Sequence, residues 1–199
     1  HLWCLNINLN LPHRCVYTIG ARSKIIGIIG GVSWESTVLY YKLINESIRD
    51  KLGGLNSAQL IIRSLNYEPI VAYERQANWQ AVEKILLEAA VNLQDSGAQL
   101  LILACNTLHK VSPAIETAIQ IPFLHITDAI AEALQNANIH KVGLLGTEFT
   151  MEENFYVQRL EEKYNFEVLI PSAKDRKALD NIIYKELCLG KLVESSRQR

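Results

Sequence analysis

The segment Leu100-Leu-Ile-Leu-Ala-Cys-Asn-Thr-Leu-His109 decides the fold. Five apolar residues lead directly into Cys105, and the polar break Asp95-Ser96-Gly97 precedes them. A short, uninterrupted apolar run of this kind is typical of a strand buried on both faces in a parallel sheet. Cys105 would then stand at the carboxyl end of the strand, where open α/β sheets bind their ligands.

The residues after this strand suggest an ionisable thiol. Asn106 or Thr107 can cap a following helix, and the backbone N–H groups and dipole of a helix N-terminus favour a thiolate. His109 lies four residues after Cys105 and is expected at the same mouth, one helical turn away. The alternative is that Cys105 is only a small buried hydrophobic residue, because free cysteine is among the most buried residue types.

Composition narrows the class of protein. The 199 residues are 49% hydrophobic and 21% charged, with a formal net charge of −1, which indicates a soluble globular protein with a real core. The chain has no basic stripe for nucleic acid and no apolar run long enough for a membrane span. Its four cysteines, which lack CxxC spacing, predict neither a metal site nor a disulfide scaffold, so we expect a cytoplasmic protein.

The first ordered segment is predicted to be a strand, a glycine turn and a helix. An Ile-rich strand within 24–33 reaches Gly30-Gly31, and a helix begins near Ser33 or Ser36 and ends at Gly53-Gly54. Such a turn can present N–H groups to an anion, although the glycines could equally serve only close strand–helix packing. The pattern is neither GxGxxG nor a P-loop.

The next segments continue the alternation of strands and helices. We expect a strand over 58–65, a polar loop that carries Arg75, and a helix over 79–96. A short helix over 111–119, a strand over 122–125 that ends in His125, and a helix over 128–136 complete this part. We interpret His125 as a buried structural histidine rather than a ligand.

The pattern then starts again. Val142-Gly-Leu-Leu-Gly-Thr147 repeats the spacing of Ile26-Gly-Ile-Ile-Gly-Gly31, and a helix over 152–163, a strand over 167–170 and a helix over 174–189 follow. The prediction is an α/β protein of two pseudo-symmetric lobes, each a parallel sheet flanked by helices. The first lobe would cover 24–118 and the second 119–199, with residues 1–23 an extension outside the fold. The repeat spacing places the counterpart of Cys105 beyond residue 199, so the second lobe is expected to be incomplete.

Four motifs together carry a family resemblance. They are Gly30-Gly-Val-Ser-Trp-Glu-Ser-Thr37, Cys105-Asn-Thr-Leu-His109, Leu145-Gly-Thr-Glu-Phe-Thr-Met151 and Ile182-Ile-Tyr-Lys-Glu-Leu-Cys188. In this order, over about residues 24–199, the chain resembles the aspartate/glutamate racemase family, and within it the aspartate-racemase-like amino-acid racemases.

The resemblance implies a cofactor-independent racemase that interconverts the L and D forms of an acidic amino acid, aspartate or glutamate. Members use two cysteines, one per lobe, on opposite faces of the α-carbon, and are often homodimers. By position, Cys105 matches the first catalytic cysteine, and no metal or other cofactor is implied. The substrate-binding positions would be Ser33, Arg75, Asn106, Thr107, Thr147 and Lys177, and His109 would tune the Cys105 thiol.

One feature departs from the family pattern. The second cysteine, in a Gly-Cys-Thr-Glu segment, does not occur in the sequence, and Cys188 belongs to a different motif. We therefore expect this polypeptide to be impaired in racemisation. The alternatives are an inactive small-carboxylate-binding protein of the same fold, a hydantoin racemase or maleate isomerase type of enzyme, and a Cys–His thiol hydrolase.

Overall fold

A computed structural model of the chain describes residues 24–198 and divides the chain into two compact units, one ending at Ala129 and the other beginning at Ile130. The predicted extension over 1–23 lies outside the described residues. The division falls later than the boundary expected after residue 118, because the strand Phe123–Leu124 pairs within the first sheet.

The first unit is built on a four-stranded parallel sheet. Its spatial order is β2-β1-β3-β4, and the strands are Ile26–Gly30 (β1), Leu60–Ser64 (β2), Leu100–Leu103 (β3) and Phe123–Leu124 (β4). In the register, Ile29 lies opposite Leu103, so the turns that follow β1 and β3 leave the sheet at the same edge. The strands are shorter than predicted, but each of the four was expected.

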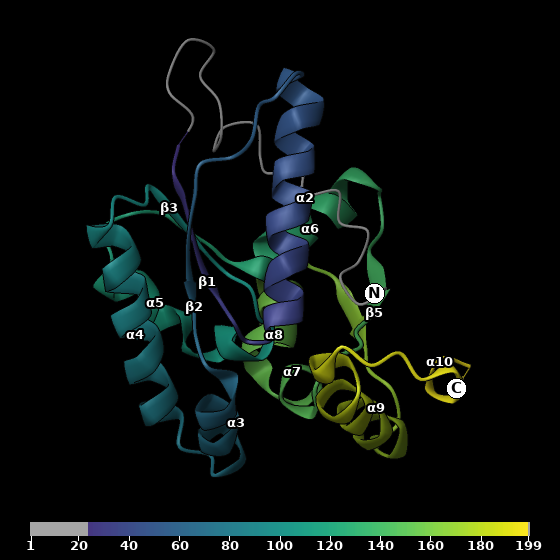
Figure 1. Cartoon of the computed structure of the whole chain (residues 1–199). Helices are drawn as coiled ribbons and strands as arrows, with labels where there is room; N and C mark the ends of the chain where they lie inside the picture. The colour runs from purple at the N-terminus through teal and green to yellow at the C-terminus, as the bar shows by residue number, and fades with distance from the viewer. Residues whose placement is uncertain (1–23, 199) are drawn as a thin grey trace. The chain divides into compact units, whose positions relative to one another are not determined.

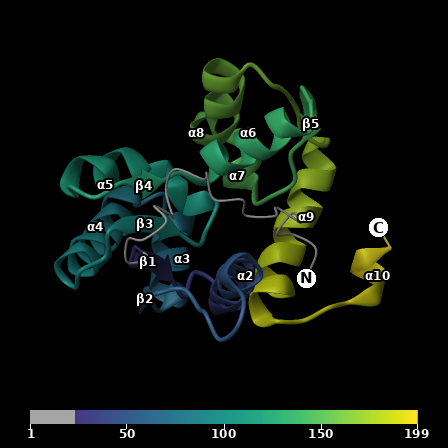
Figure 2. The same ribbon diagram turned by 90° about the horizontal axis from the view of Figure 1, so that it is seen from above.

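Both faces of this sheet are covered, as the continuous apolar runs predict. Alternate residues of β1 and β3 face opposite sides, since side chains alternate along a strand. One set, which includes Ile28 and Ile102, packs against Ile44 and Ile48 of helix Trp34–Leu52 (α2). The other set packs against helices Trp79–Asp95 (α4) and Ser112–Ala118 (α5), which lie on the opposite side of the sheet (Figure 1, Figure 2).

The prediction for the segment between β2 and α4 was wrong. The polar loop expected between β2 and α4 contains helix Tyr67–Arg75 (α3). The Asn66 side chain caps it by accepting from the Glu68 N–H at 3.4 Å, and Ile70 and Val71 are buried. The sequence did not predict this short helix, because charged residues interrupt the helical pattern of its apolar residues.

Helix Ile126–Asn136 (α6) follows β4, and the second unit begins within it. The second unit contains a two-stranded parallel sheet of Lys141–Gly143 (β5) and Glu167–Leu169 (β6). The single helix expected over 152–163 is divided into Glu148–Glu152 (α7), Asn154–Gln158 (α8) and a π-helical turn, Arg159–Lys163 (η2). Glu153 has an extended backbone and separates α7 from α8.

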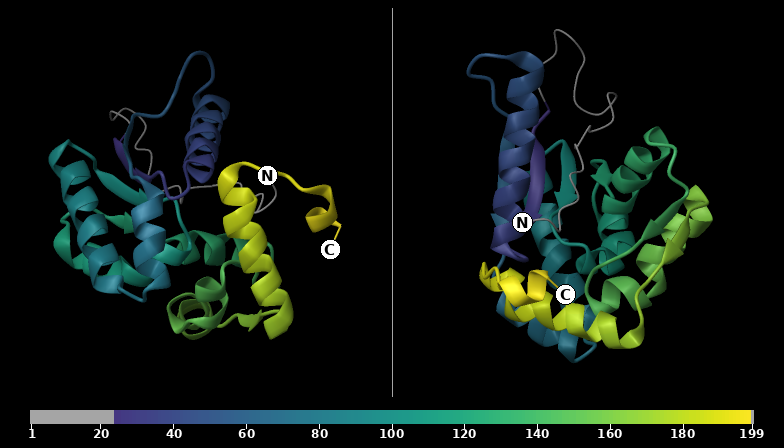
Figure 3. Two further views of the ribbon diagram at one scale, coloured as in Figure 1. Left: turned by 60° about the horizontal axis from the view of Figure 1, so that its bottom comes forward. Right: turned by 90° about the vertical axis from the view of Figure 1, so that its right-hand side faces the viewer.

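The chain continues after β6 with a longer helix. Helix Ala173–Lys185 (α9) is prominent in both views of Figure 3. It ends before the predicted limit of residue 189, and a 3₁₀ turn, Leu187–Leu189 (η3), and helix Glu194–Arg197 (α10) follow. Over residues 24–198, no helix has the length and apolar character that crossing a bilayer requires.

Candidate active site

Cys105 lies just past the carboxyl end of the central strand β3. The Ala104 N–H donates to the Ile29 carbonyl at 2.9 Å, so the sheet holds the backbone up to the residue before the cysteine. Residues 100–104 are buried, Cys105 is half-buried and Asn106 is exposed. The thiol therefore stands at the end of the buried strand, beside the exposed Asn106, and the end of the strand is where the sequence predicts Cys105.

The turn after Cys105 differs from the predicted helix start. Residues Thr107–Val111 form a 3₁₀ turn (η1), and α5 begins only at Ser112. Asn106 precedes the 3₁₀ turn and its side chain makes no capping hydrogen bond there, whereas Thr107 is buried. The side-chain cap predicted for this position is therefore not formed by Asn106.

His109 contacts the backbone of Cys105. Its Nδ1 lies 2.6 Å from the Cys105 carbonyl oxygen, and its Nε2 accepts from the Ile126 N–H at 3.2 Å. The ring is buried, with 1% of its surface exposed, and stacks edge-on with His125 at a centroid distance of 4.5 Å. His109 thus bonds to the main chain on both sides.

The glycine turn after β1 lies beside Cys105 at the same edge of the sheet. Gly31 has a φ of +82°, and its N–H donates to the Thr37 hydroxyl oxygen at 2.8 Å. The Thr37 hydroxyl in turn donates to the Ser33 carbonyl at 3.1 Å. Ser33 precedes α2 and is buried, but its own hydroxyl makes no capping bond to that helix.

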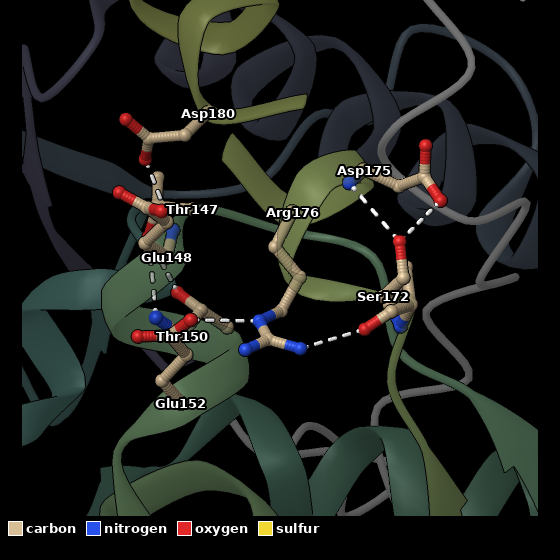
Figure 4. Close-up of polar contacts among 9 residues, drawn as sticks. Thr147, Glu148, Thr150, Glu152, Ser172, Asp175, Arg176 and Asp180 are labelled. Carbon is tan, nitrogen blue, oxygen red and sulfur yellow. Dashed lines mark hydrogen bonds and ion pairs between the residues drawn. The ribbon is translucent and has the colours of Figure 1, made fainter. Parts of the chain in front are cut away.

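The second glycine turn, in the second unit, is built in a similar way. Thr147 precedes α7, and its hydroxyl oxygen accepts from the Thr150 N–H at 3.2 Å and lies 3.0 Å from the Thr150 hydroxyl (Figure 4). A Cβ placed on Gly146 would lie 3.1 Å from Thr150, much as one on Gly30 would crowd Thr37. In both turns a threonine in the first turn of the following helix packs against the glycine.

The two predicted cations are both exposed. Arg75 is the last residue of α3 in the first unit, and Lys177 lies in α9 of the second unit. Ser33 follows β1, and Cys105, Asn106 and Thr107 follow β3, at the same edge of the first sheet. Thr147 and Lys177 belong to the second unit.

Sequence reasoning did not single out three residues with defined contacts near these turns. Thr37 closes the first turn, and its place four residues after Ser33 was an available signal. Asp180 accepts from the Glu148 N–H at 3.0 Å, at the first residue of α7 (Figure 4). Arg176 donates to Glu152 at 2.7 Å and to the Pro171 carbonyl at 2.7 Å. The contacts of Asp180 with Glu148 and of Arg176 with Glu152 are long-range and have no local sequence signal.

Among residues 24–198, no group of three or more His, Cys, Asp or Glu side chains is arranged to hold a metal ion. The cysteines in that part of the chain, Cys105 and Cys188, are not disulfide-bonded.

Comparison with known proteins decides the family. The sequence model of the Asp/Glu/Hydantoin racemase family matches residues 29–198. The chain belongs to this family. The match includes both glycine turns and the Cys-Asn-Thr loop, which carried the resemblance in the sequence.

Solved structures agree with this racemase fold. The chain is similar to the crystal structure of a proposed Asp/Glu racemase from Yersinia pestis, with 46% identity, 88% of this chain and 76% of that one covered, and a TM-score of 0.80. It is also similar to an aspartate racemase homologue from Pyrococcus horikoshii OT3, with 39% identity, 84% and 73% coverage, and a TM-score of 0.72.

Among curated proteins, the chain is 26% identical over 133 residues to the broad-specificity amino-acid racemase RacX of Bacillus subtilis. That match covers 66% of this chain and 58% of the relative, so the chain spans little more than half of the relative's length. These relatives bear the names of racemases, which are isomerases.

Proposed function

We propose that the chain contributes to a cofactor-independent racemase for an acidic amino acid, aspartate or glutamate, with Cys105 as a proton-transferring thiol. The observation that carries this proposal is the position of Cys105. It is a half-buried thiol at the end of the central strand, next to the glycine turn after β1, in a chain that the racemase family model matches.

The chemistry suits a thiol. A thiolate is a competent base near neutral pH, because a cysteine ionises far more readily than a serine or threonine hydroxyl. The substrate carboxylates would be held by hydrogen-bond donors, for which we propose Ser33, Asn106 and Thr107 in the first unit. Thr147 and Lys177, in the second unit, are proposed as substrate-binding positions on the basis of the sequence motifs alone. Arg75 is a further candidate for the side-chain carboxylate. Such donors would also stabilise the negative charge that develops when the α-proton leaves.

A single thiol serves one face of the α-carbon. Inversion needs a second acid on the opposite face, and the sequence of residues 1–199 contains no Gly-Cys-Thr-Glu segment to supply it. The 199-residue polypeptide is therefore expected to exchange the α-proton of one enantiomer with solvent and to return the new proton to the same face.

The test uses the 199-residue polypeptide in deuterated water, with each enantiomer of aspartate and glutamate supplied separately. We expect α-deuterium to enter one enantiomer of one acidic amino acid, while chiral chromatography detects no change in its configuration. Cys105→Ser should slow the exchange by about 10²-fold or more, because it removes the base. Cys188→Ser is the matched control and should leave the rate unchanged.

Other outcomes distinguish the alternatives. If the protein exchanged the ring C–H proton of a 5-substituted hydantoin for deuterium, but not the α-proton of any acidic amino acid, the chain would be assigned to the hydantoin branch of the family. Thermal stabilisation by millimolar aspartate without any exchange would favour a binding protein. Absence of both exchange and stabilisation would contradict the proposal. A homodimer and a cytoplasmic location remain predictions, and sedimentation equilibrium tests the first.

A further inference from the structure

Two buried histidines lie together beside Cys105 in the first unit. His109 and His125 are 1% and 2% exposed, and their rings meet edge to face at a centroid distance of 4.5 Å. Phe123 packs against both, at 5.7 Å from the His109 ring and 6.3 Å from the His125 ring. Two imidazoles in such an apolar setting must have their ring nitrogens satisfied by specific partners.

The partners of His109 define its protonation state. A carbonyl oxygen only accepts a hydrogen bond, so Nδ1 must carry the proton that it donates to Cys105 at 2.6 Å. A backbone N–H only donates, so Nε2 must present its lone pair to Ile126 at 3.2 Å. His109 is therefore a neutral imidazole protonated at Nδ1.

The partners of His125 define the opposite tautomer. Its Nδ1 accepts from the Thr127 N–H at 3.2 Å and lies 2.7 Å from the Thr127 hydroxyl oxygen. Because the amide donates to Nδ1, the proton of a neutral His125 must be on Nε2. The two adjacent rings thus carry their protons on different nitrogens.

The bond from His109 replaces a missing backbone contact. In an α-helix, the Cys105 carbonyl would accept from the N–H of residue 109, four residues later. Here that N–H bonds to the Asn106 carbonyl at 3.1 Å, as a 3₁₀ turn requires. The ring Nδ1–H of His109 donates to the Cys105 carbonyl instead, and the other ring nitrogen, Nε2, accepts from the Ile126 N–H at the start of α6.

We propose that His109 is a positioning residue for Cys105: as a neutral imidazole, it fixes the Cys105 carbonyl and thereby the place of the thiol at the strand end. This inference depends on the proposed function of Cys105. It gives a specific form to the expectation that His109 tunes the thiol, because a neutral ring bonded to main-chain groups on both sides contributes orientation rather than a positive field.

The first test reads the tautomers directly. In the intact protein labelled with ¹⁵N, ring-nitrogen chemical shifts distinguish protonated from unprotonated nitrogens, and His109→Asn and His125→Asn variants assign the signals. We expect His109 to be protonated at Nδ1 alone and His125 at Nε2 alone near neutral pH. A His109 that is protonated at Nε2, or doubly protonated, would overturn the inference.

The second test separates the two hydrogen bonds of His109 with amide side chains that each replace one ring nitrogen. Asn places its Nδ2 near the position of Nδ1, and asparagines at 45, 92 and 181 already donate to the carbonyl four residues earlier, at 2.8, 2.6 and 2.8 Å. His109→Asn should therefore keep the bond to Cys105. His109→Gln offers its amide oxygen near Nε2, and so keeps the bond to Ile126 and loses the one to Cys105.

The readout is the alkylation rate of Cys105 by iodoacetamide across a pH series, measured by mass spectrometry on variants that urea titration shows to be folded. His109→Asn should react within about twofold of the parent. His109→Gln should react about three- to tenfold more slowly at neutral pH, because the loosened thiol can turn toward the apolar cluster on which Cys105 packs, where a thiolate is disfavoured. His125→Asn is the matched control, since it removes a buried imidazole without removing either bond of His109, and it should keep the parent profile.

Equal profiles for the two His109 variants would overturn the inference. Where α-proton exchange is measurable, His109→Gln should lower kcat by about 10-fold or more with little change in KM, as expected for a misplaced base. If the parent protein exchanges no α-proton, the proposed function fails, but the tautomer and alkylation experiments still decide the role of His109.

Discussion

Gly31 has no room for a side chain. It has a φ of +82°, and a Cβ added there would overlap the backbone nitrogen and oxygen of Leu65, which cannot withdraw because the Leu65 N–H donates to the Gly30 carbonyl at 2.9 Å. Gly31→Ala should lower the free energy of unfolding by about 4 kcal/mol or more, since backbone atoms rather than a flexible side chain block the methyl group. Urea denaturation measures the loss.

Gly54 provides the matched control for this substitution. It also has a positive φ, +59°, but a Cβ there would meet no atom within 4 Å. Gly54→Ala should cost only about 1–2 kcal/mol, the penalty of the left-handed backbone alone. If the two variants lost equal stability, close approach to Leu65 would not be the reason for the glycine at 31.

The burial of Tyr156 predicts that the second unit loses stability at alkaline pH. Its side chain is buried, and burial raises the pKa of its phenol above the ordinary value of about 10. Below about pH 10 the phenol is neutral in both the folded and unfolded states; at higher pH only the unfolded state ionises, so stability falls as the pH rises. Urea titrations from about pH 8 to pH 11 should show this loss in the parent protein and a smaller one in Tyr156→Phe.

Tyr41 is the control tyrosine, because 52% of its surface is exposed. Tyr41→Phe should retain the alkaline loss of the parent in full. An unchanged alkaline loss in Tyr156→Phe would show that another group causes the sensitivity.

At the scale of elements, apolar runs predicted the first unit well. The strands of the first sheet, α2 and α4 were all expected, because the Ile- and Leu-rich strands and the helical spacing of the apolar residues in α4 are strong local signals. The 3₁₀ turn after Cys105 and the break at Glu153 were missed because each depends on hydrogen bonds that the apolar pattern does not encode.

In the candidate site, too, the features with a local sequence signal were predicted and those that depend on distant contacts were not. Cys105 was correctly placed at the end of a buried strand, since a strand boundary is visible where the apolar run stops. The sequence placed His109 near Cys105, but its contact with Ile126 was not predictable. Ile126 is 17 residues away in the chain, and pairing it with a ring nitrogen requires the sheet to bring β3 and β4 together.

Helix α9 makes polar contacts with α7. No residue of Ala173–Lys185 is fully buried, but Arg176 bonds both to Glu152 of α7 and to the Pro171 carbonyl (Figure 4). Arg176→Lys keeps the charge but cannot make both of these hydrogen bonds, and should lower the stability of the second unit by about 1–2 kcal/mol. Circular dichroism during thermal unfolding measures this loss of stability.

Arg197 is the control arginine. It pairs with Glu194 at 3.8 Å, and both side chains are exposed to solvent. Arg197→Lys should be neutral, because exposed ion pairs contribute little. Equal effects of the two substitutions would indicate that the Arg176 contacts do not hold α9.

At the scale of the whole molecule, the two units differ in the size of their cores. Both large clusters of buried apolar residues lie in the first unit, on the two faces of its sheet. In the part of the second unit that the structure describes, the fully buried side chains are fewer, and Met151, Tyr156 and Leu160 are the largest. Buried apolar area dominates stability, so the second unit should be the less stable one.

Native-state hydrogen exchange tests this difference. Amides of β1 and β3 should exchange only through global unfolding, whereas those of β5 and β6 should exchange through a smaller opening, with an opening free energy lower by about 2 kcal/mol or more. Equal protection in both sheets would show that the chain unfolds as one cooperative body.

The ion pair at the start of the small sheet has a consequence for strand alignment. Lys141 lies opposite Glu167 in the register, and their charged groups meet at 2.6 Å. Sliding either strand by one residue would separate these charges and would place Val142 and Val168 on opposite sides of the ribbon. The two charged side chains are 58% and 59% exposed, so the ion pair favours this alignment only slightly, and the half-buried Val142 and Val168, which lie opposite each other, favour the same pairing.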